Sequence, residues 1–416
     1  MFTASRPRYR IIFAALAACV LFSISLAQAS EGEVAALNRA IQAQGAQWVA
    51  GETSLTSLSP DARKRRLGAL KPLLTDEDHK AAAREQAALA EVTPPASYDW
   101  RATATGNWVT PVRNQGNCGS CWAFATTAAA ESQTLMSNNT PGLDLNLAEQ
   151  LLVSCSPAGN CNGGYISTAS NYIRDLGLPV ETCFPYTATN NSCSNACQGW
   201  TNNSYHIAGW HWVVTTAPTV EALKSALVTY GPLVTTMDVY SDFFSYRSGI
   251  YRYVSGTYQG GHAILIVGYD DPGQYFIVKN SWGTGWGEAG YFRIAYSQLS
   301  SVVDFGAYTI ADEGGNPAPP PPPPPSCTYS ISPTSKSFKA AGGSGVVTLS
   351  TQDTCDWTAV SNVTWVNVTS GASGNGSGSV SYTVEANATN LQRSGTMTIA
   401  GQTFTVNQQA ARSRGK

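Results

Sequence analysis

The sequence predicts an α+β domain followed by a small all-β domain. Between about residues 96 and 313, helical patterns come before strand patterns along the chain, which is typical of the α+β class. From residue 327 to about 410, short alternating segments rich in Ser, Thr and Val are separated by Gly, Ser and Asn, as in a β-sandwich. A run of seven prolines, residues 319–325, lies between the two domains. In the polyproline II conformation this run forms a stiff spacer of about 22 Å.

The N-terminus has the features of a secretory signal peptide. Three arginines precede an apolar run at residues 11–26, and Ala27-Gln-Ala29 is a small-residue cleavage site. These features predict that residues 1–29 direct the protein to a periplasmic or extracellular location. Cys19 ends a short sequence similar to a lipobox, so lipid anchoring at Cys19 is kept as the minor alternative.

The next segment, residues 30–95, contains no cysteine and is dominated by Ala, Glu, Arg, Lys and Gln. Its apolar residues recur at helical spacing from Val34 to Ala50, which predicts a helix there. The alternative for this polar segment is a flexible spacer.

Helical patterns in the first half of the main domain are followed by a strand-rich second half with many glycines and aromatic residues. The predicted helices are residues 123–136, 148–153 and 166–176. A domain spanning residues 96–313 is long enough to bury a sizeable core.

The motif Gln115-Gly-Asn-Cys-Gly-Ser-Cys-Trp-Ala-Phe124 holds a candidate nucleophile, Cys121. A thiol with an ordinary pKa near 8.5 is mostly protonated at neutral pH, so a nucleophilic cysteine needs a cationic or dipolar neighbour. An Ala-rich helix is predicted to begin near Cys121, and a helix N-terminus favours the thiolate.

The candidate general base is His262, which stands at the start of the apolar strand pattern of residues 263–269. A histidine on a core strand is held rigidly, as a general base must be. Asn280 follows the next strand pattern and could orient the imidazole by accepting a hydrogen bond from one ring nitrogen. Together these residues form the Cys-His-Asn variant of a catalytic triad.

The pair Cys118-Gly-Ser-Cys121 also allows two other interpretations, a redox pair or half of a zinc site. Zinc would require a second ligand pair at similar spacing, and the sequence has none. A redox pair would leave Gln115, His262 and Asn280 unexplained. The sequence therefore predicts no metal and no cofactor.

These motifs resemble those of the papain family of cysteine peptidases, whose local signature is Cys-Gly-(Ser/Ala)-Cys-(Trp/Tyr). The resemblance implies a two-lobed fold, one lobe helical and one β-barrel-like, with Cys121 and His262 facing each other across a cleft. It also implies that Gln115 donates to the oxyanion and that Trp282 shields the contact between histidine and asparagine from water.

The same resemblance gives residues 30–95 the role of an inhibitory propeptide. The sequence from Thr93 to Arg101 resembles the start of a mature family member, so processing is expected near Ala96.

The resemblance also predicts the substrate contacts. Gly163 and Gly164 would pair with the substrate backbone, because small residues allow close approach. The pocket for the second residue before the cut (P2) would be roomy and mostly apolar, without an acidic residue at its floor, which favours a hydrophobic P2 residue over Arg. No insertion blocks one end of the cleft, so an endopeptidase is favoured over an exopeptidase. The expected pocket residues are Tyr165, Ile166, Thr236, Gly260, Ala263 and Ile310.

Nine cysteines remain after the signal peptide, and an odd number in a secreted chain suggests one free thiol. With Cys121 free, the resemblance implies a Cys118–Cys161 bridge. It leaves two arrangements open for the next four residues: Cys155 pairs with Cys193 or Cys197, and Cys183 pairs with the other. Cys327 and Cys355 are expected to join within the C-terminal domain.

The C-terminal domain, residues 327–410, resembles the BACON-type, immunoglobulin-like domains appended to secreted bacterial enzymes. Residues 314–326 form the linker before it, and residues 411–416 form a tail. The resemblance implies a glycan or surface ligand, with a passive spacer as the alternative. Trp357 and Trp365 could stack on sugars, although a tryptophan in a small sandwich is more often part of the core.

A formal net charge of −2 and a pI near 6.1 give no reason to expect nucleic acid or an anionic membrane as a partner. The sequence thus predicts a monomeric, secreted cysteine endopeptidase that acts on polypeptides through a thioester intermediate. The alternative is a catalytically silent surface-binding protein, which would be expected to lack one of the four catalytic residues.

Overall fold

The structure is a computed structural model that describes residues 32–315, 327–352 and 355–411. The expected signal peptide (1–29), with Cys19, lies outside the described residues, as does most of the linker. The chain divides into two compact units, Met1–Pro319 and Pro320–Lys416. In the part that the structure describes, no helix combines the length and the apolar character needed to cross a membrane.

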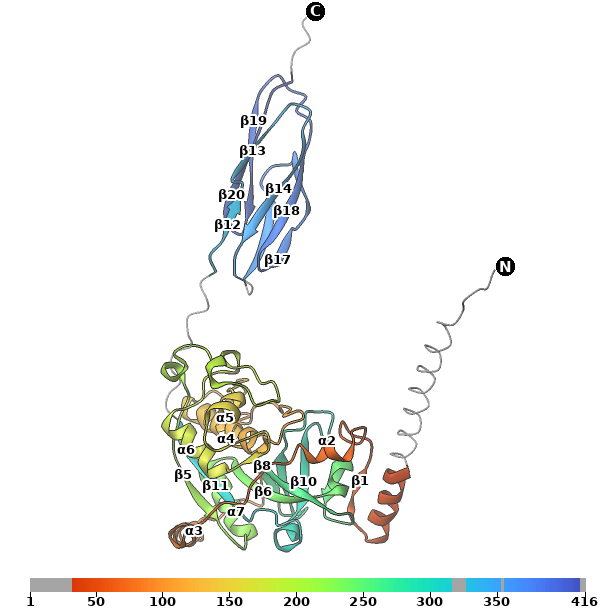
Figure 1. Ribbon diagram of the computed structural model, residues 1–416, viewed down its shortest axis with the longest axis vertical. Coiled ribbons are helices and arrows are strands. Elements are labelled where there is room, and N and C mark those ends of the chain that lie inside the picture. The colour runs from red at the N-terminus through yellow and green to blue at the C-terminus, as the bar shows by residue number, and fades with distance from the viewer. Residues whose placement is uncertain (1–31, 316–326, 353–354, 412–416) are drawn as a thin grey trace, which may run out of the picture. The chain divides into compact units, whose positions relative to one another are not determined.

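The first unit is built on a nine-stranded, mostly antiparallel sheet (Figure 1). Its strand order is β1-β7-β10-β9-β8-β6-β11-β5, and β2 pairs with β8. β8 is the longest strand, and its residues from His262 to Tyr269 are all buried, as its apolar sequence predicts. The strands are β1 (Gln47–Ala50), β2 (Ser97–Asp99), β5 (Ile207–Val214), β6 (Leu233–Tyr240), β7 (Tyr246–Tyr251), β8 (Tyr258–Asp270), β9 (Tyr275–Lys279), β10 (Tyr291–Ala295) and β11 (Thr309–Gly315).

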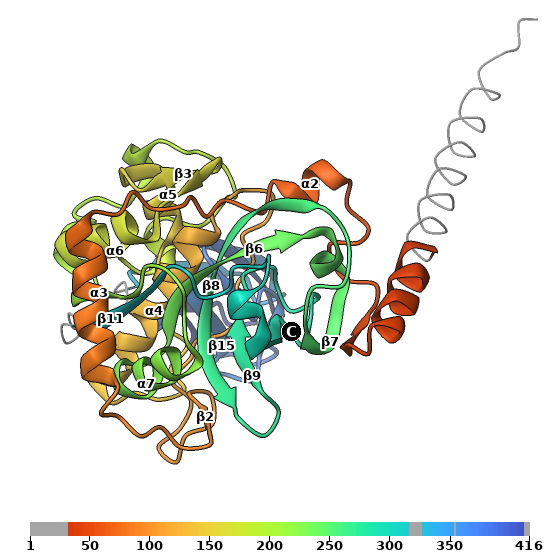
Figure 2. The same cartoon turned by 90° about the horizontal axis from the view of Figure 1, so that it is seen from below.

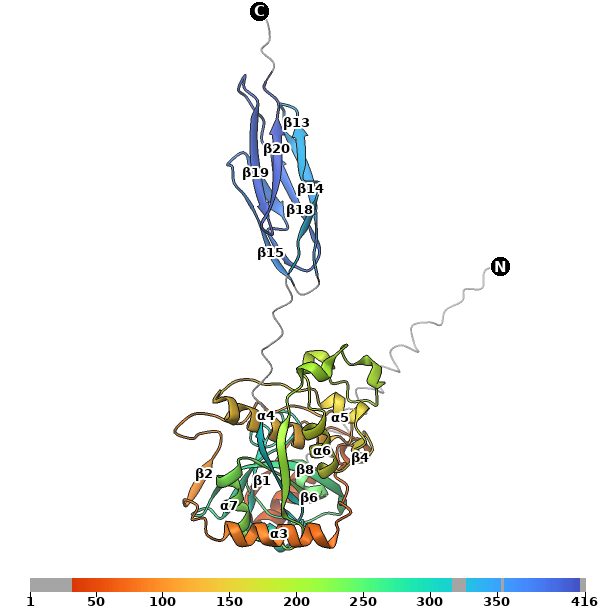
Figure 3. The same ribbon diagram turned by 90° about the vertical axis from the view of Figure 1, so that its left-hand side faces the viewer.

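Helices gather on the other side of this unit around α4, which packs against β8 and β11 (Figure 3). Every residue of α4 from Cys121 to Leu135 is buried, because its alanines let neighbouring elements approach closely. Asn139, in the left-handed conformation with φ 52°, ends the helix. The three helices predicted here are confirmed with small shifts of their ends. The helices around α4 (Cys121–Asn138) are α5 (Glu149–Cys155) and α6 (Ile166–Asp175), whereas α7 (Val220–Tyr230) packs on β5, β8 and β11. A short ribbon joins β3 (Gly159–Asn160) to β4 (Gly163–Gly164).

Two hydrophobic cores confirm the α+β prediction. One lies on the sheet side and is rich in aromatic residues, among them Phe243, Trp286 and Phe292. The other surrounds α4 and includes Trp122 and Leu151. The unit therefore has a helical lobe and a sheet lobe.

The segment before the main domain folds onto both lobes. Residues 32–43 are helical, but the helix predicted to continue to Ala50 ends early. Gly45 takes a positive φ of 62°, and β1 then pairs with β7 at the edge of the sheet. Trp48 supplies the reason: its indole is buried, with its ring centroid 5.2 Å from that of Tyr251. The gain from burying a tryptophan outweighs the local helical preference.

Two capped helices follow, α2 (Pro60–Lys64) and α3 (Asp76–Leu89). Ser59 caps α2, and Thr75 with Asp78 forms a capping box on α3. α3 lies against β5 and α7, and the chain between α2 and α3 crosses from one lobe to the other (Figure 2). Residues 30–95 are therefore packed against the domain in the described part, which does not fit the flexible-spacer alternative.

The second unit is a β-sandwich with a core of its own, which includes Val380, Tyr382 and Phe404. One sheet has the order β12-β14-β18-β16 and the other β13-β20-β19-β15-β17. The strands are β12 (Ser330–Ser332), β13 (Ser335–Phe338), β14 (Gly343–Ser350), β15 (Asp356–Ser361), β16 (Val366–Ser370), β17 (Ser373–Asn375), β18 (Gly378–Val384), β19 (Arg393–Ile399) and β20 (Gln402–Gln408).

Candidate active site

Cys121 is the first residue of α4 and is the free cysteine of the described part of the chain. Its side chain is fully buried. Backbone N–H groups of Ala263 and Trp122 donate toward the sulfur, and these bonds favour the thiolate. Because Ala263 follows His262 directly, β8 brings the predicted base to the same place as the predicted nucleophile.

His262 is held by two neighbours from the segment after β9. Its Nε2 lies 2.8 Å from Oδ1 of Asn280, and its ring stacks on Trp282 with centroids 4.6 Å apart. Among the described residues, Nδ1 of His262 has no hydrogen-bond partner. Burial lowers the pKa of His262 to about 4, and the bond to Asn280 opposes that change. The imidazole is thus neutral, with one nitrogen tied to Asn280.

Gln115 is fixed at both ends of its side-chain amide. Ser281 donates its hydroxyl to Oε1 at 2.7 Å, which leaves Nε2 as the donor. Nε2 donates to the carbonyl of Cys118 at 2.8 Å and to the carbonyl of Arg66 at 2.9 Å. Ser281 was not singled out from the sequence, although its place beside Asn280 could have suggested a supporting role.

The N-terminal segment occupies the site. Gly68 and Ala69 donate their backbone N–H groups to the carbonyl of Gly261, both at 3.1 Å, and also toward the Cys121 sulfur. Gly164 donates to the carbonyl of Gly68 at 2.8 Å, and Leu70 donates to the carbonyl of Gly164 at 3.0 Å. The segment and β4 form a parallel bridge, Ala69 with Gly164. The predicted substrate-binding glycines therefore bind the chain's own N-terminal segment.

This occupancy changes the protonation expected of the nucleophile. The helix N-terminus was expected to favour a thiolate, yet burial raises the pKa of Cys121 to about 11 despite the backbone donors. Desolvation disfavours the charged form more than the donors stabilise it. With the segment in place, Cys121 is a neutral thiol beside a neutral imidazole.

The predicted P2 pocket residues do not all face one pocket. Ile166, Ala263 and Ile310 are buried within the helical core, and Tyr165 directly precedes α6. Gly260 faces Leu67, whose Cβ lies 3.2 Å from the position that a Cβ on Gly260 would take.

Thr236, by contrast, lines a cavity together with Gly261 and with Ala69 and Lys71 of the N-terminal segment. Asp238 and Asp304 line the same cavity. At Thr236, one of the six residues predicted for the P2 pocket, the surrounding cavity therefore contains acidic residues. Asp238 lies two residues after Thr236 on β6, and Asp304 reaches the cavity from the loop before β11.

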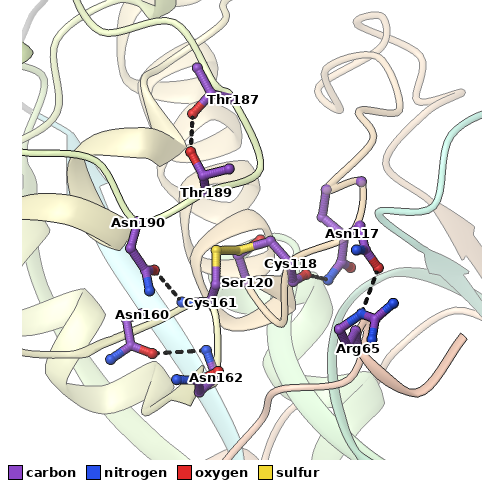
Figure 4. The surroundings of a disulfide bond; sticks show 12 residues. Arg65, Asn117, Cys118, Ser120, Asn160, Cys161, Asn162, Thr187, Thr189 and Asn190 are labelled. Atoms are coloured by element: carbon purple, nitrogen blue, oxygen red, sulfur yellow. Dashed lines mark hydrogen bonds between the residues drawn. A yellow bond between two sulfur atoms is a disulfide. The ribbon is translucent and has the colours of Figure 1, made fainter. Parts of the chain in front are cut away.

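The structure forms four disulfides and resolves the pairing left open by the sequence. In Figure 4 the Cys118–Cys161 bridge ties the loop before Cys121 to the turn that carries β4. Asn190 accepts a hydrogen bond from the N–H of Cys161 at 2.8 Å, and Arg65 of the N-terminal segment donates to Asn117 at 3.2 Å. The other bridges are Cys155–Cys193, Cys183–Cys197 and Cys327–Cys355.

Comparison with known families identifies the main domain. The family described as "Papain family cysteine protease" matches residues 94–310, more than half of the chain. The chain belongs to the papain family. The match begins close to the processing site expected near Ala96.

Curated relatives of this papain-family chain include a cathepsin L-like proteinase of Fasciola hepatica and cathepsin L2 of Homo sapiens. The first is 41% identical over 209 residues, covering 48% of this chain and 60% of the relative. The second is 40% identical over 214 residues, covering 48% of this chain and 60% of the relative. The chain thus spans less than two thirds of the length of these relatives.

Solved structures of precursors align over more of the chain than the family match does. A digestive procathepsin L2 proteinase from Tenebrio molitor larval midgut aligns with a TM-score of 0.58 and 28% identity, covering 74% of this chain and 95% of that one. A recombinant stem bromelain precursor aligns with a TM-score of 0.55 and 26% identity, covering 69% and 90%. The first unit therefore has a papain-like fold.

No group of three or more His, Cys, Asp or Glu side chains suited to a metal ion occurs among the residues that the structure describes. The zinc alternative for Cys118 and Cys121 is contradicted more directly, because Cys118 is bonded to Cys161. The same bond excludes a redox pair between Cys118 and Cys121.

Proposed function

We propose that the protein is a secreted, monomeric cysteine endopeptidase, made as a latent precursor, that hydrolyses peptide bonds in polypeptides. The observation that carries this proposal is the meeting of Cys121, His262, Asn280 and Gln115 at one point of the cleft, with a stretch of the chain's own backbone bound across it. Four disulfides fit an oxidising compartment and hence secretion.

Catalysis would begin with transfer of the thiol proton of Cys121 to Nδ1 of His262. The thiolate attacks the peptide carbonyl, and the developing oxyanion receives hydrogen bonds from Nε2 of Gln115 and from a backbone N–H at the start of α4. The carbonyl of Arg66, 2.9 Å from Nε2 of Gln115, shows that this amide can reach a bound carbonyl.

His262 then gives its proton to the leaving amine, and the acyl group stays on Cys121 as a thioester. Water, deprotonated by the same imidazole, attacks the thioester and regenerates the thiol. Asn280 keeps the ring in the orientation needed for both steps, and Trp282 covers one face of it.

The bound segment supports an endopeptidase. Residues 66–71 pass through the site without a break, and residues on both sides of Gly68 contact the cleft. A cleft that accepts backbone on both sides of the nucleophile can accept the interior of a polypeptide chain.

The same segment explains latency. Its chain runs parallel to β4, and the amide nitrogens of Gly68 and Ala69 donate toward Cys121. The segment thus covers the nucleophile, and activation requires removal of residues 30–95.

The test is labelling of the purified, processed protein with an epoxysuccinyl cysteine-protease probe, with Cys121→Ala as the matched control. We expect labelling and hydrolysis of fluorogenic peptides by the processed protein, neither by the Cys121→Ala variant, and little by the unprocessed chain. Absence of labelling in correctly processed protein would overturn the assignment and leave the silent surface-binding alternative.

We further propose that the C-terminal sandwich is a binding module without a part in catalysis, with a glycan or surface ligand. Trp357 does not supply the ligand contact: it is 6% exposed and donates its indole N–H to Gly376 in the core. Trp365 is half-buried, with the Arg393 guanidinium 4.3 Å from its ring centroid. Removal of residues 320–416 should leave peptide hydrolysis unchanged and abolish binding to immobilised glycans or cell surfaces.

A further inference from the structure

A small acidic cavity adjoins the catalytic cysteine. It is lined by Thr236, Asp238, Gly261 and Asp304, and by Ala69 of the bound N-terminal segment. Ala69 also donates its N–H toward the Cys121 sulfur, so the cavity lies within one or two residues of bound chain from the nucleophile. Since Thr236 was assigned to the P2 pocket, a substrate side chain close to the cut is expected to enter here.

The cavity already holds a cationic group. The ammonium of Lys71 lies 3.8 Å from a carboxylate oxygen of Asp238 and 3.8 Å from one of Asp304. With Lys71 in place, about 30 Å³ of the cavity stays open to a water molecule. The N-terminal segment thus binds with an ammonium between two carboxylates.

The two carboxylates are held in place by the backbone of the domain. β6 carries Asp238, whose N–H donates to the carbonyl of Val303, the residue before Asp304. This bond joins the two acidic positions directly. Asp304 itself has a φ of 49°, a conformation that Asp tolerates better than most residues.

Removal of the segment takes away the cation. Of the residues that line the cavity in the described structure, Lys71 is the one with a positive charge, and it leaves with residues 30–95. Asp238, whose side chain is only 18% exposed, would then be a partly desolvated carboxyl group beside Asp304, and burial already raises its pKa. A ligand that brings its own cationic group would stabilise the ionised carboxylate and pair with it.

We infer that Asp238 and Asp304 make this pocket select a lysine or arginine side chain at P2 of the substrate. The inference rests on the proposed endopeptidase function and reverses the hydrophobic preference expected from the sequence. Tyr258 and Tyr308 complete the wall and can pack along the aliphatic stem of a long basic side chain.

The test compares the processed enzyme on three peptides that differ only at P2: arginine, its uncharged isostere citrulline, and leucine. We expect a higher kcat/KM for arginine than for citrulline. Asp238→Asn and Asp304→Asn should each lower the arginine-to-citrulline ratio a few-fold, and together by on the order of 10-fold, as for partly exposed ion pairs. The leucine peptide serves as the internal reference, and the arginine-to-leucine ratio of kcat/KM should fall in the Asn variants together with the arginine-to-citrulline ratio.

Glu221→Gln removes an exposed carboxylate from the first turn of α7 and is the matched control, which should leave the ratio unchanged. The inference would be overturned if the wild type had an arginine-to-citrulline ratio of kcat/KM near one. It would also be overturned if both Asn variants left that ratio unchanged. In either case the endopeptidase proposal would stand. If the processed enzyme cleaves none of the three peptides, the leucine peptide included, both the endopeptidase proposal and this inference are wrong.

Discussion

The side-chain amide of Gln115 donates a hydrogen bond of 2.9 Å to the main-chain carbonyl of Arg66. One partner belongs to the proposed catalytic site and the other to the segment proposed as an inhibitory propeptide. In this proposal the precursor uses its oxyanion donor to hold its own inhibitor in place. The consequence is that Gln115 serves two states of the protein, the latent one and the active one.

Gln115→Ala should therefore impair the processed enzyme mainly in kcat. Loss of one oxyanion donor costs about 10²–10³ in rate in acyl-transfer enzymes, while ground-state binding changes little. The measurement is steady-state hydrolysis of a fluorogenic peptide by the processed variant. Ser281→Ala, which removes the hydroxyl that orients the amide, should give a smaller loss of the same kind. A Gln115→Ala enzyme within a few-fold of wild-type kcat would refute the oxyanion role.

Asn280→Ala should lower kcat by up to about 10²-fold, because the imidazole loses the partner that fixes its orientation. General acid–base catalysis contributes a rate enhancement of about 10²–10⁴, and a poorly oriented imidazole loses part of it. The bond to Asn280 also raises the pKa of His262, so its removal should move the histidine-dependent limb of the pH–rate profile to lower pH. A merely structural role would lower kcat without moving that limb. The profile of the Asn280→Ala enzyme from pH 3 to 9 separates the two cases.

The residues of the proposed site are easier to recognise in the sequence than the residues around them. Cys121, His262, Asn280 and Gln115 are recognisable because each stands in a local motif. Asp238 and Asp304 stand in no motif. They meet because β6 pairs with β8 and because the N–H of Asp238 bonds to Val303, and both are contacts between distant segments.

The N-terminal segment also shows that local sequence patterns do not reveal contacts between distant segments. Helical spacing predicted one helix from Val34 to Ala50, but the burial of Trp48 against β7 makes a strand of residues 47–50. The raised pKa of Cys121 was equally out of reach, because it comes from the complete burial of the thiol, which no local pattern around Cys121 indicates. Local pattern indicates which residues react, and long-range packing determines their protonation and their neighbours.

The reactivity of Cys121 should depend on pH differently in the two forms. In the precursor, burial raises the thiol pKa to about 11, so the thiolate is scarce at neutral pH and becomes abundant only as the pH approaches 11. Removal of the segment exposes the sulfur to water and leaves the helix N-terminus and His262 beside it, which should lower the pKa. Iodoacetamide alkylation rates from pH 5 to 10 should therefore rise steadily for the precursor and level off at lower pH for the processed enzyme. Identical profiles would contradict this account.

Latency itself should depend on Gly68. A Cβ at this residue would stand 1.9 Å from the carbonyl oxygen of Gly119, a backbone atom that cannot move aside. Gly68→Val should therefore push the segment out of the cleft and give the unprocessed chain measurable peptidase activity and probe labelling. Because β1 and α3 still anchor the segment on both lobes, we expect partial rather than complete activation.

The matched control for that variant is Gly32→Ala, which lies in the same segment and where a Cβ would meet no atom within 4 Å. It should stay as latent as the wild type. The mature domain is unaltered in both variants, so after processing they should match the wild type in kcat and KM. A Gly68→Val precursor that remains silent, and that releases normal activity once processed, would show that the backbone contacts at Gly68 do not control access to Cys121. Latency would then have to come from the docking of β1 and α3, and truncations that remove each element in turn would show which of the two is responsible.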